Sequence, residues 1–235
     1  MRTLAILPIK SFGAAKQRLS GLLGGGSRQA LAQAMFLDVL ASLRRVPGID
    51  AVAVVTADAD AETAARRGGV HLLYDPDEAG QSLAAGIGVR HALAHGFERV
   101  LLVPGDTPLI DAREVGMMLA RAEEERTAAV IVPDRHGSGT NALLLAPPEA
   151  MAPSFGPDSL ERHRATASRA GIDHRVEALA SLMLDVDTPA DLTELSAILA
   201  ERRGQACMTR GALRQLDRVK VQPRVAIVPA VRAQA

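Results

Sequence analysis

The chain has 235 residues, enough for one α/β domain of ordinary size, and its 48% hydrophobic and 2% aromatic content predicts a core of Ala, Leu and Val. Its 27 basic residues balance 27 acidic ones, and zero net charge argues against a nucleic-acid-binding or membrane-surface protein. The single cysteine, Cys207, excludes an intrachain disulfide and a multi-cysteine metal site.

The first strand is predicted at residues 3–7, where Pro8 closes an aliphatic run. This strand begins almost directly after Met1, so we expect no signal peptide. No apolar run approaches the roughly 20 residues that span a bilayer. The sequence therefore predicts a cytoplasmic protein without a membrane partner.

A basic loop follows the first strand and carries Lys10, Lys16 and Arg18. In a doubly wound sheet this position faces the edge at which ligands bind, where cations can neutralise a triphosphate. A solvated loop without function is the alternative. The loop has no Walker pattern, because the run Gly24-Gly25-Gly26 lies too far along the chain.

The next segments alternate between helix and strand. Ser27 can cap a helix whose core-facing stripe repeats every four residues from Leu31 to Leu43. The predicted ranges are a helix at 28–46, a strand at 51–56, a helix at 60–67 and a strand at 71–74.

A further helix is predicted to start near Gln81 or Ser82 and to run to about His95. Together with Gly80, this helix start offers free amides and two polar side chains that can recognise the edge of a nucleobase. Ordinary helix capping explains Ser82 equally well.

Asp106 is the most informative acidic residue. It follows a buried strand at residues 99–103, and Pro104-Gly105 ends that strand. A carboxylate at the carboxyl end of a core strand can hold Mg²⁺ against the phosphates of a nucleotide. An aspartate that only stabilises its own turn is the alternative.

A helix at 111–125 and a strand at 128–132 precede the polar loop 134–141, which leads into a strand at 142–145. The glycines of this loop allow main-chain amides to approach an anion, although a plain hairpin loop is also consistent with the pattern.

Two later segments add candidate ligand groups. Ser159 lies at the first turn of a helix that runs to about residue 170 and can form an anion site there, or simply cap the helix. Asp185 and Asp187 point to the same side of an extended segment and offer a second source of metal ligands. The following helix, 190–202, carries Asp191 where it can cap that helix.

After Gly204 the composition changes to Arg, Val and Ala with scattered prolines. We expect a single nucleotidyltransferase domain at 1–204 and a partly disordered extension at 205–235, in which 219–221 and 225–228 can pair as strands or add to a neighbour's sheet. The six histidines show no metal-ligand spacing, so we assign none to a metal.

Five stretches together resemble the CofC family of guanylyltransferases from coenzyme F(420) biosynthesis, over roughly residues 3–203. They are residues 7–10 with 15–19, the turn 104–108, the loop 134–141, residues 155–159 and residues 185–189. The resemblance implies a single-domain, three-layer, Rossmann-like nucleotidyltransferase (GT-A-like) α/β fold with a mixed, mostly parallel central sheet. Related sugar-nucleotide and molybdopterin-guanine enzymes usually begin with a glycine-rich loop ending in Arg, where this chain has Pro8-Ile9-Lys10.

The resemblance also implies a reaction. GMP passes from GTP to a small phosphorylated carboxylic acid and pyrophosphate leaves, with Mg²⁺ as cofactor. Phosphoenolpyruvate is the usual acceptor in bacterial members, and 2-phospho-L-lactate or 3-phospho-D-glycerate in others.

Carried onto this chain, the resemblance and the loop chemistry assign the following site residues. The catalytic set is Lys10, Lys16, Arg18 and Asp106, and the metal ligands are Asp106 with Asp185 or Asp187. The nucleotide-binding set is Pro8, Lys10, Gly80, Gln81 and Ser82. The acceptor-binding set is Thr140, Asn141, Gly156 and Ser159.

Two other functions stay open at this point: a molybdenum-cofactor-type nucleotidyltransferase that uses CTP or GTP, and a non-catalytic nucleotide-binding paralogue. The acidic residues argue against the paralogue, because a binding module does not need two metal carboxylates. The partners expected are GTP and the phospho-acid, and the sequence leaves a homodimer open.

Overall fold

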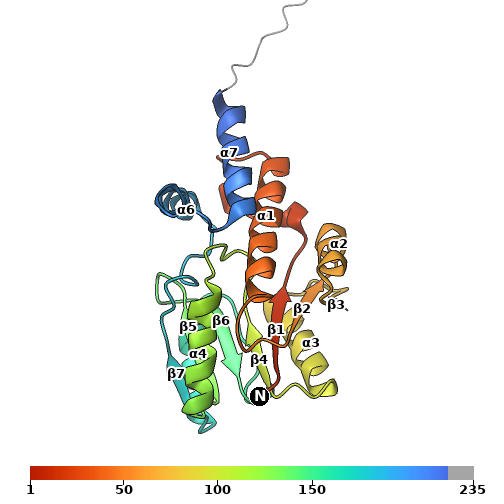
Figure 1. The fold of residues 1–235 in the computed structure, drawn as a ribbon, viewed down its shortest axis with the longest axis vertical. Coiled ribbons are helices and arrows are strands. Elements are labelled where there is room, and N and C mark those ends of the chain that lie inside the picture. The colour runs from red at the N-terminus through yellow and green to blue at the C-terminus, as the bar shows by residue number, and fades with distance from the viewer. Residues whose placement is uncertain (222–235) are drawn as a thin grey trace, which may run out of the picture.

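The computed structural model describes residues 1–221, and one seven-stranded sheet forms its centre in the order β3-β2-β1-β4-β6-β5-β7 (Figure 1). The strands are β1 (Thr3–Pro8), β2 (Ala51–Thr56), β3 (His71–Tyr74), β4 (Arg99–Leu102), β5 (Ala129–Pro133), β6 (Thr140–Leu145) and β7 (His174–Val176).

One strand of the sheet runs against the others. β1, β2, β3 and β4 pair in parallel, as do β5 and β7, whereas β6 pairs antiparallel with both β4 and β5. The central strands are buried along their whole length, which explains their aliphatic runs without polar alternation. The predicted mixed, mostly parallel sheet is confirmed.

Helices cover both faces of the sheet. On one face the core contains side chains of α1, α2 and α4, and on the other it contains side chains of α3 and α5. The helices are α1 (Gly25–Leu43), α2 (Ala59–Gly68), α3 (Gln81–Ala94), α4 (Ala112–Glu124), α5 (Ser159–Arg169), α6 (Pro189–Glu201) and α7 (Cys207–Val221).

A third apolar cluster joins the end of the chain to its beginning. Leu31 and Met35 of α1 pack with leucines of α6, and Leu213 and Leu216 of α7 pack against this cluster. Figure 1 shows α7 lying beside α1. The extension is therefore helical over 207–221. This differs from the strand pairing expected at 219–221, and the partner segment 225–228 lies outside the described residues.

Other differences concern element boundaries. α1 begins at Gly25 after an N-cap at Gly24 without a side-chain cap, so Ser27 lies inside the helix and is not its cap. β7 was missed because three residues are too short for a recognisable alternation. Two short 3-10 turns, Phe12–Ala14 and Gln17–Leu19, shape the basic loop. Among residues 1–221, no helix is both long and apolar enough to cross a membrane.

Candidate active site

The strand directions bring distant segments to one edge of the sheet. The parallel strands β1, β3 and β4 end at this edge, next to Lys10, Asp75 and Asp106 respectively. The reversed strand β6 begins there with Thr140. Ligands bind at this edge in open α/β sheets, so topology alone gathers the candidate residues.

A cavity of about 320 Å³ opens at this edge. Apolar walls from Phe12 and Phe36 face a polar rim. The predicted site residues that line it are Pro8, Lys10, Lys16, Gly80, Gln81, Asp106 and Asp187. The cavity thus holds the predicted nucleotide-binding residues other than Ser82, two of the predicted cations and two of the predicted metal ligands.

Lys16 joins two of the carboxylates. Its Nζ lies 2.5 Å from Asp106 Oδ2 and 2.9 Å from Asp187 Oδ1, and its side chain is only 7% exposed. Burial acts to lower the pKa of Lys16, but the charges of Asp106 and Asp187 outweigh burial and raise this pKa above its ordinary value. The backbone of Lys16 is in the left-handed region (φ 55°), which is uncommon for a non-glycine residue. Lys16 is therefore held, charged, between the two acidic segments.

The Asp106 turn is packed tightly onto the first loop. A Cβ at Gly105 would lie 2.3 Å from Cδ1 of Ile9, so a larger residue here would require the Ile9 side chain to move. The Val186 N–H donates to the Asp106 carbonyl (3.2 Å) and connects the turn to the second acidic segment. Asp106 Oδ1 is buried and has no hydrogen-bond partner among the described residues, which leaves it free for a ligand.

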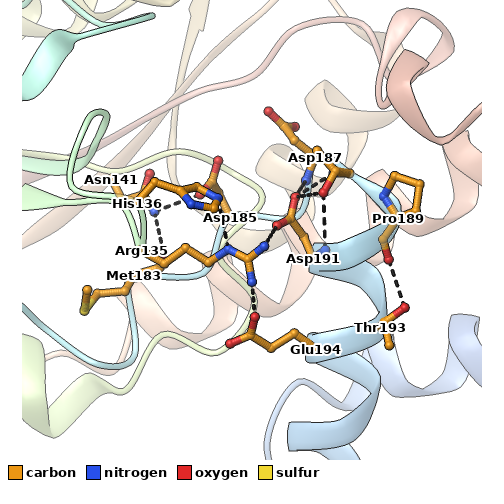
Figure 2. Close-up of polar contacts among 11 residues, drawn as sticks. Arg135, His136, Asn141, Met183, Asp185, Asp187, Pro189, Asp191, Thr193 and Glu194 are labelled. Atoms are coloured by element: carbon orange, nitrogen blue, oxygen red, sulfur yellow. Dashed lines mark hydrogen bonds and ion pairs between the residues drawn. The ribbon is translucent and has the colours of Figure 1, made fainter.

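Figure 2 shows how the segment around Asp187 is fixed. Asp191 Oδ2 accepts hydrogen bonds from the N–H groups of Asp187 (3.0 Å) and Thr188 (2.6 Å), and this completes a capping box at the start of α6. Arg135 lies 2.5 Å from the other Asp191 oxygen and also pairs with Glu194. Burial opposes the charge on Asp191, but the hydrogen bonds to Thr188 and Asp187 and the charge of Arg135 give a lowered pKa. Asp191 thus holds Asp187 in place, and its predicted capping role is confirmed.

Asn141 holds the neighbouring segment. Its amide nitrogen donates to the carbonyls of Leu182 and Met183 and to Asp185 Oδ1, at 2.9–3.1 Å (Figure 2). Burial, followed by the charge of Asp106, raises the pKa of Asp185. Because its amide hydrogens are already used, Asn141 supports the acidic segment and has none left to donate to an anionic acceptor.

The predicted acceptor side lies beyond the cavity lining. Thr140 is 7% exposed and Ser159 is 1% exposed. Gly156 has φ 110° at the turn before α5, and the Ser159 N–H donates to its carbonyl (3.1 Å). In the loop 134–139, the amides of residues 137 and 138 bond to Asp134, so they are not free to bind an anion as we expected.

Arg18 and Ser82, like Asp185 and the acceptor-binding residues, do not line the cavity. Arg18 is exposed at the end of the second 3-10 turn. Ser82 Oγ accepts a hydrogen bond from the Phe155 N–H (2.8 Å), so it joins α3 to the loop before α5. The expected start of α3 is confirmed, since Gly80 (φ 126°) is its N-cap and Gln81 its first residue.

Comparison with known proteins identifies the family. The chain matches the family described as "Guanylyl transferase CofC like" over residues 3–230. The chain belongs to this family. The match extends well past residue 203, where we expected the resemblance to end, and the residues of α7 fall within the matched range. The family also favours this assignment over the molybdenum-cofactor type considered above.

Relatives and solved structures agree with the family. The chain is 50% identical to a phosphoenolpyruvate guanylyltransferase of Conexibacter woesei, over 93% of this chain and 98% of the relative. It is 38% identical to one from Sphaerobacter thermophilus, over 83% of this chain and 93% of the relative.

Two solved structures share the fold. A nucleotidyl transferase from Methanothermobacter has a TM-score of 0.60 at 15% identity, covering 86% of this chain and 99% of that one. A 4-diphosphocytidyl-2C-methyl-D-erythritol synthase has a TM-score of 0.58 at 14% identity, covering 84% and 99%. The predicted nucleotidyltransferase fold is confirmed.

Sequence reasoning missed an acidic residue of the cavity. Asp75 follows β3 directly, lines the cavity beside Gly80 and Gln81, and is 6% exposed. Burial, then the charges of Glu78 and Asp77, raise its pKa. No cation of the described residues forms an ion pair with it. Its position after a strand, like that of Asp106, was the signal available in the sequence.

Proposed function

We propose that this chain transfers GMP from GTP to phosphoenolpyruvate, with release of pyrophosphate, in coenzyme F(420) biosynthesis. The family and the names of its relatives support this activity. The structural observation that carries the proposal is the buried Lys16 held between Asp106 and Asp187 at the rim of the cavity. A phosphoryl-transfer site needs charges of both signs at this edge of the sheet.

In the proposed reaction an oxygen of the acceptor phosphate attacks the α-phosphorus of GTP. The bond from that phosphorus to the bridging oxygen breaks, and the electron pair leaves with pyrophosphate. Both reactants are anions, and each charge pair at ~4 Å repels by roughly 1–4 kcal/mol, depending on the local dielectric. Lys10 and Lys16 line the cavity and can offset this repulsion.

The acidic residues fit a divalent cation. One lysine between two carboxylates leaves an excess of negative charge, and Asp106 Oδ1 is buried without a partner among the described residues. We propose Asp106 and Asp187 as Mg²⁺ ligands, since Asp187 is 45% exposed while Asp185 is engaged by Asn141. Bound Mg²⁺ would supply positive charge against the nucleotide phosphates.

Asp75 supports the choice of guanine. The Watson–Crick edge of guanine presents two adjacent N–H donors, at N1 and N2, and an ionised carboxylate accepts from both. Adenine and cytosine each place an acceptor where guanine has a donor. A buried carboxylate beside the Gly80–Gln81 helix start therefore favours GTP among the nucleotides.

The acceptor is proposed to bind beside this cavity, at Thr140 and the Gly156–Ser159 turn. Thr140 starts the strand next to β4, so it lies at the same sheet edge as Asp106. The start of α5 adds the partial positive charge of a helix N-terminus, which favours an anion.

A pyrophosphate-release assay tests the function. GTP, ATP, CTP and UTP are each combined with phosphoenolpyruvate, 2-phospho-L-lactate or 3-phospho-D-glycerate, with and without Mg²⁺. We expect the highest turnover with GTP and phosphoenolpyruvate, and a loss of about 10²–10³-fold or more in Asp106→Asn. Asp60→Asn, an exposed position on α2 outside the cavity lining, is the matched control. Higher turnover with CTP than with GTP would contradict the proposal.

The domain division at residue 204, the cytoplasmic location, the possibility of a homodimer and the absence of nucleic-acid and membrane partners stay predictions from the sequence.

A further inference from the structure

His163 connects the two segments proposed to bind the acceptor. It lies on α5 and is fully buried, at 0% exposure. Its Nδ1 lies 3.0 Å from Thr140 Oγ1, and its Nε2 lies 2.9 Å from the main-chain nitrogen of Ser154. Neither the phosphate-binding residues nor the metal ligands proposed above include this histidine.

These two contacts fix the tautomer of the ring. A main-chain N–H can only donate, so Nε2 accepts from Ser154 and carries no proton. Burial, and then the positive charge of Arg162, lower the pKa of His163 to about 4, so the ring is neutral near pH 7. The proton must therefore be on Nδ1, which donates to Thr140 Oγ1. The hydroxyl proton of Thr140 then points elsewhere and is available to an anionic oxygen.

A bulge turns Thr140 toward this histidine. Pro133 pairs with Thr140 while Val132 pairs with Ala142, so the register skips Asn141. Ala142 packs in the cluster with α1 and α4, whereas Thr140 contacts α5 on the opposite face. In a regular strand, side chains two positions apart share a face, so Thr140 and Ala142 would point the same way. Bulges next to active sites commonly redirect a side chain in this way.

The loop on the other side of His163 is held equally firmly. The Phe155 ring lies edge-on to the imidazole, with centroids 5.5 Å apart. Arg162 donates to the carbonyls of Ser154 and Phe155, at 3.0 and 3.1 Å. Because Gly156 and Ser159 follow directly, the position of His163 sets where the α5 start lies relative to Thr140.

We propose that His163 is a positioning residue for the phosphorylated acceptor: it directs the Thr140 hydroxyl proton at an anionic oxygen of the acid and holds the loop 154–159 beside it. This inference rests on the proposed function. It predicts that changes at His163 affect the acceptor and leave the nucleotide almost untouched, because the cavity lined by Gly80 and Gln81 does not contain His163.

The test compares Michaelis constants for phosphoenolpyruvate and GTP in Thr140→Val, His163→Gln, His163→Asn and the double variant Thr140→Val/His163→Gln. Losing a hydrogen bond to a charged group weakens binding about 10- to 150-fold, so Thr140→Val and His163→Gln should raise the acceptor constant by about this factor. The Asn amide in His163→Asn occupies the position of Nδ1 and can still donate toward Thr140, whereas the longer Gln amide occupies the position of Nε2, so His163→Asn should lie closer to the parent. The GTP constant should change by less than about threefold.

The double variant distinguishes an effect of His163 through the Thr140 hydroxyl from a general loss of packing. If His163 acts through Thr140, His163→Gln should have little further effect in the Thr140→Val background. Ala167→Gly, a buried change on the same helix, is the control for loss of packing, and thermal unfolding checks that every variant is folded. Additive losses, or equal increases in both Michaelis constants, would overturn the inference while the proposed function stands. A parent protein that neither binds nor uses any of the three acids would overturn both.

Discussion

The carboxylate of Asp38, in the middle of α1, accepts a 2.7 Å hydrogen bond from the main-chain N–H of Thr209, at the start of α7. The other Asp38 oxygen accepts from the Met208 N–H (3.1 Å). The side chain that caps α7 thus comes from a helix about 170 positions earlier. An N-cap of this kind contributes ~0.5–2 kcal/mol to stability.

Truncation after Gly204 is therefore expected to destabilise the protein. The Arg- and Pro-rich composition of residues 205–235 had instead indicated a partly disordered extension. It removes the leucines of α7 that pack against Leu31 and Met35 and leaves Asp38 without partners. Thermal unfolding should show a clearly lower midpoint. Truncation after Val221 is the control, because it keeps every described residue of α7. Asp38→Ala should lose about 1 kcal/mol in chemical denaturation, and Asp38→Asn less, since one acceptor oxygen remains. Equal midpoints for both truncations would contradict this role of α7.

Lys16 is expected to compete with Mg²⁺ in the free protein. Its ammonium occupies oxygens of both Asp106 and Asp187. Replacing it in Lys16→Met should strengthen Mg²⁺ binding without nucleotide, measured by calorimetry, while turnover falls by about 10²-fold or more. Lys10→Met is the matched control, because Lys10 lines the same cavity but is exposed and does not pair with these carboxylates. Unchanged or weaker Mg²⁺ binding in Lys16→Met would exclude this competition.

Asp75→Asn should weaken discrimination between bases. Asn presents one donor and one acceptor where guanine requires two acceptors, so kcat/KM for GTP should fall by about 10- to 100-fold relative to ATP. The parent should also lose GTP affinity as pH falls through the raised pKa of Asp75, because the protonated acid accepts poorly. The control is the KM for phosphoenolpyruvate, which should not follow either change. A uniform loss across all nucleotides would place Asp75 outside the base site.

His163 should make stability depend on pH. Its folded-state pKa of about 4 lies below the ordinary value of 6.5, so the unfolded chain binds a proton between these values while the folded chain does not. The free energy of unfolding should therefore fall as pH decreases from about 6.5 to about 4. Above this window the titration of His163 should add no pH dependence. Urea unfolding of the parent and of His163→Gln at several pH values checks this. Curves with identical slopes would show that His163 does not contribute.

The parts of this molecule that follow from short-range pattern were predictable. The aliphatic strand before Asp106 and the breaker Pro104-Gly105 located the edge of the sheet and a cavity carboxylate. Contacts between residues far apart in the sequence were not predictable. Nothing in the local sequence indicates that Lys16 meets Asp187, or that Asp38 caps α7, because the partners lie more than 150 residues apart.

Side-chain direction was a second limit. A regular strand places Thr140 on the same face as Ala142, and only the bulge at Asn141 reverses it. Ser82 had the right composition for base binding but is used by Phe155. Arg18 shared its loop with two cavity lysines but is exposed and does not line the cavity.

The reversal of β6 bears on how new acceptors can be accommodated. Because one strand runs the other way, Thr140, which is proposed to bind the acceptor, directly follows the tip of a hairpin, residues 134–139, between β5 and β6. Hairpin tips tolerate changes of length and composition that would disrupt a parallel strand or its crossover. Specificity for different phosphorylated acids can therefore diverge at this tip, while the turn at Asp106 and the cavity lined by Gly80 and Gln81 stay unchanged.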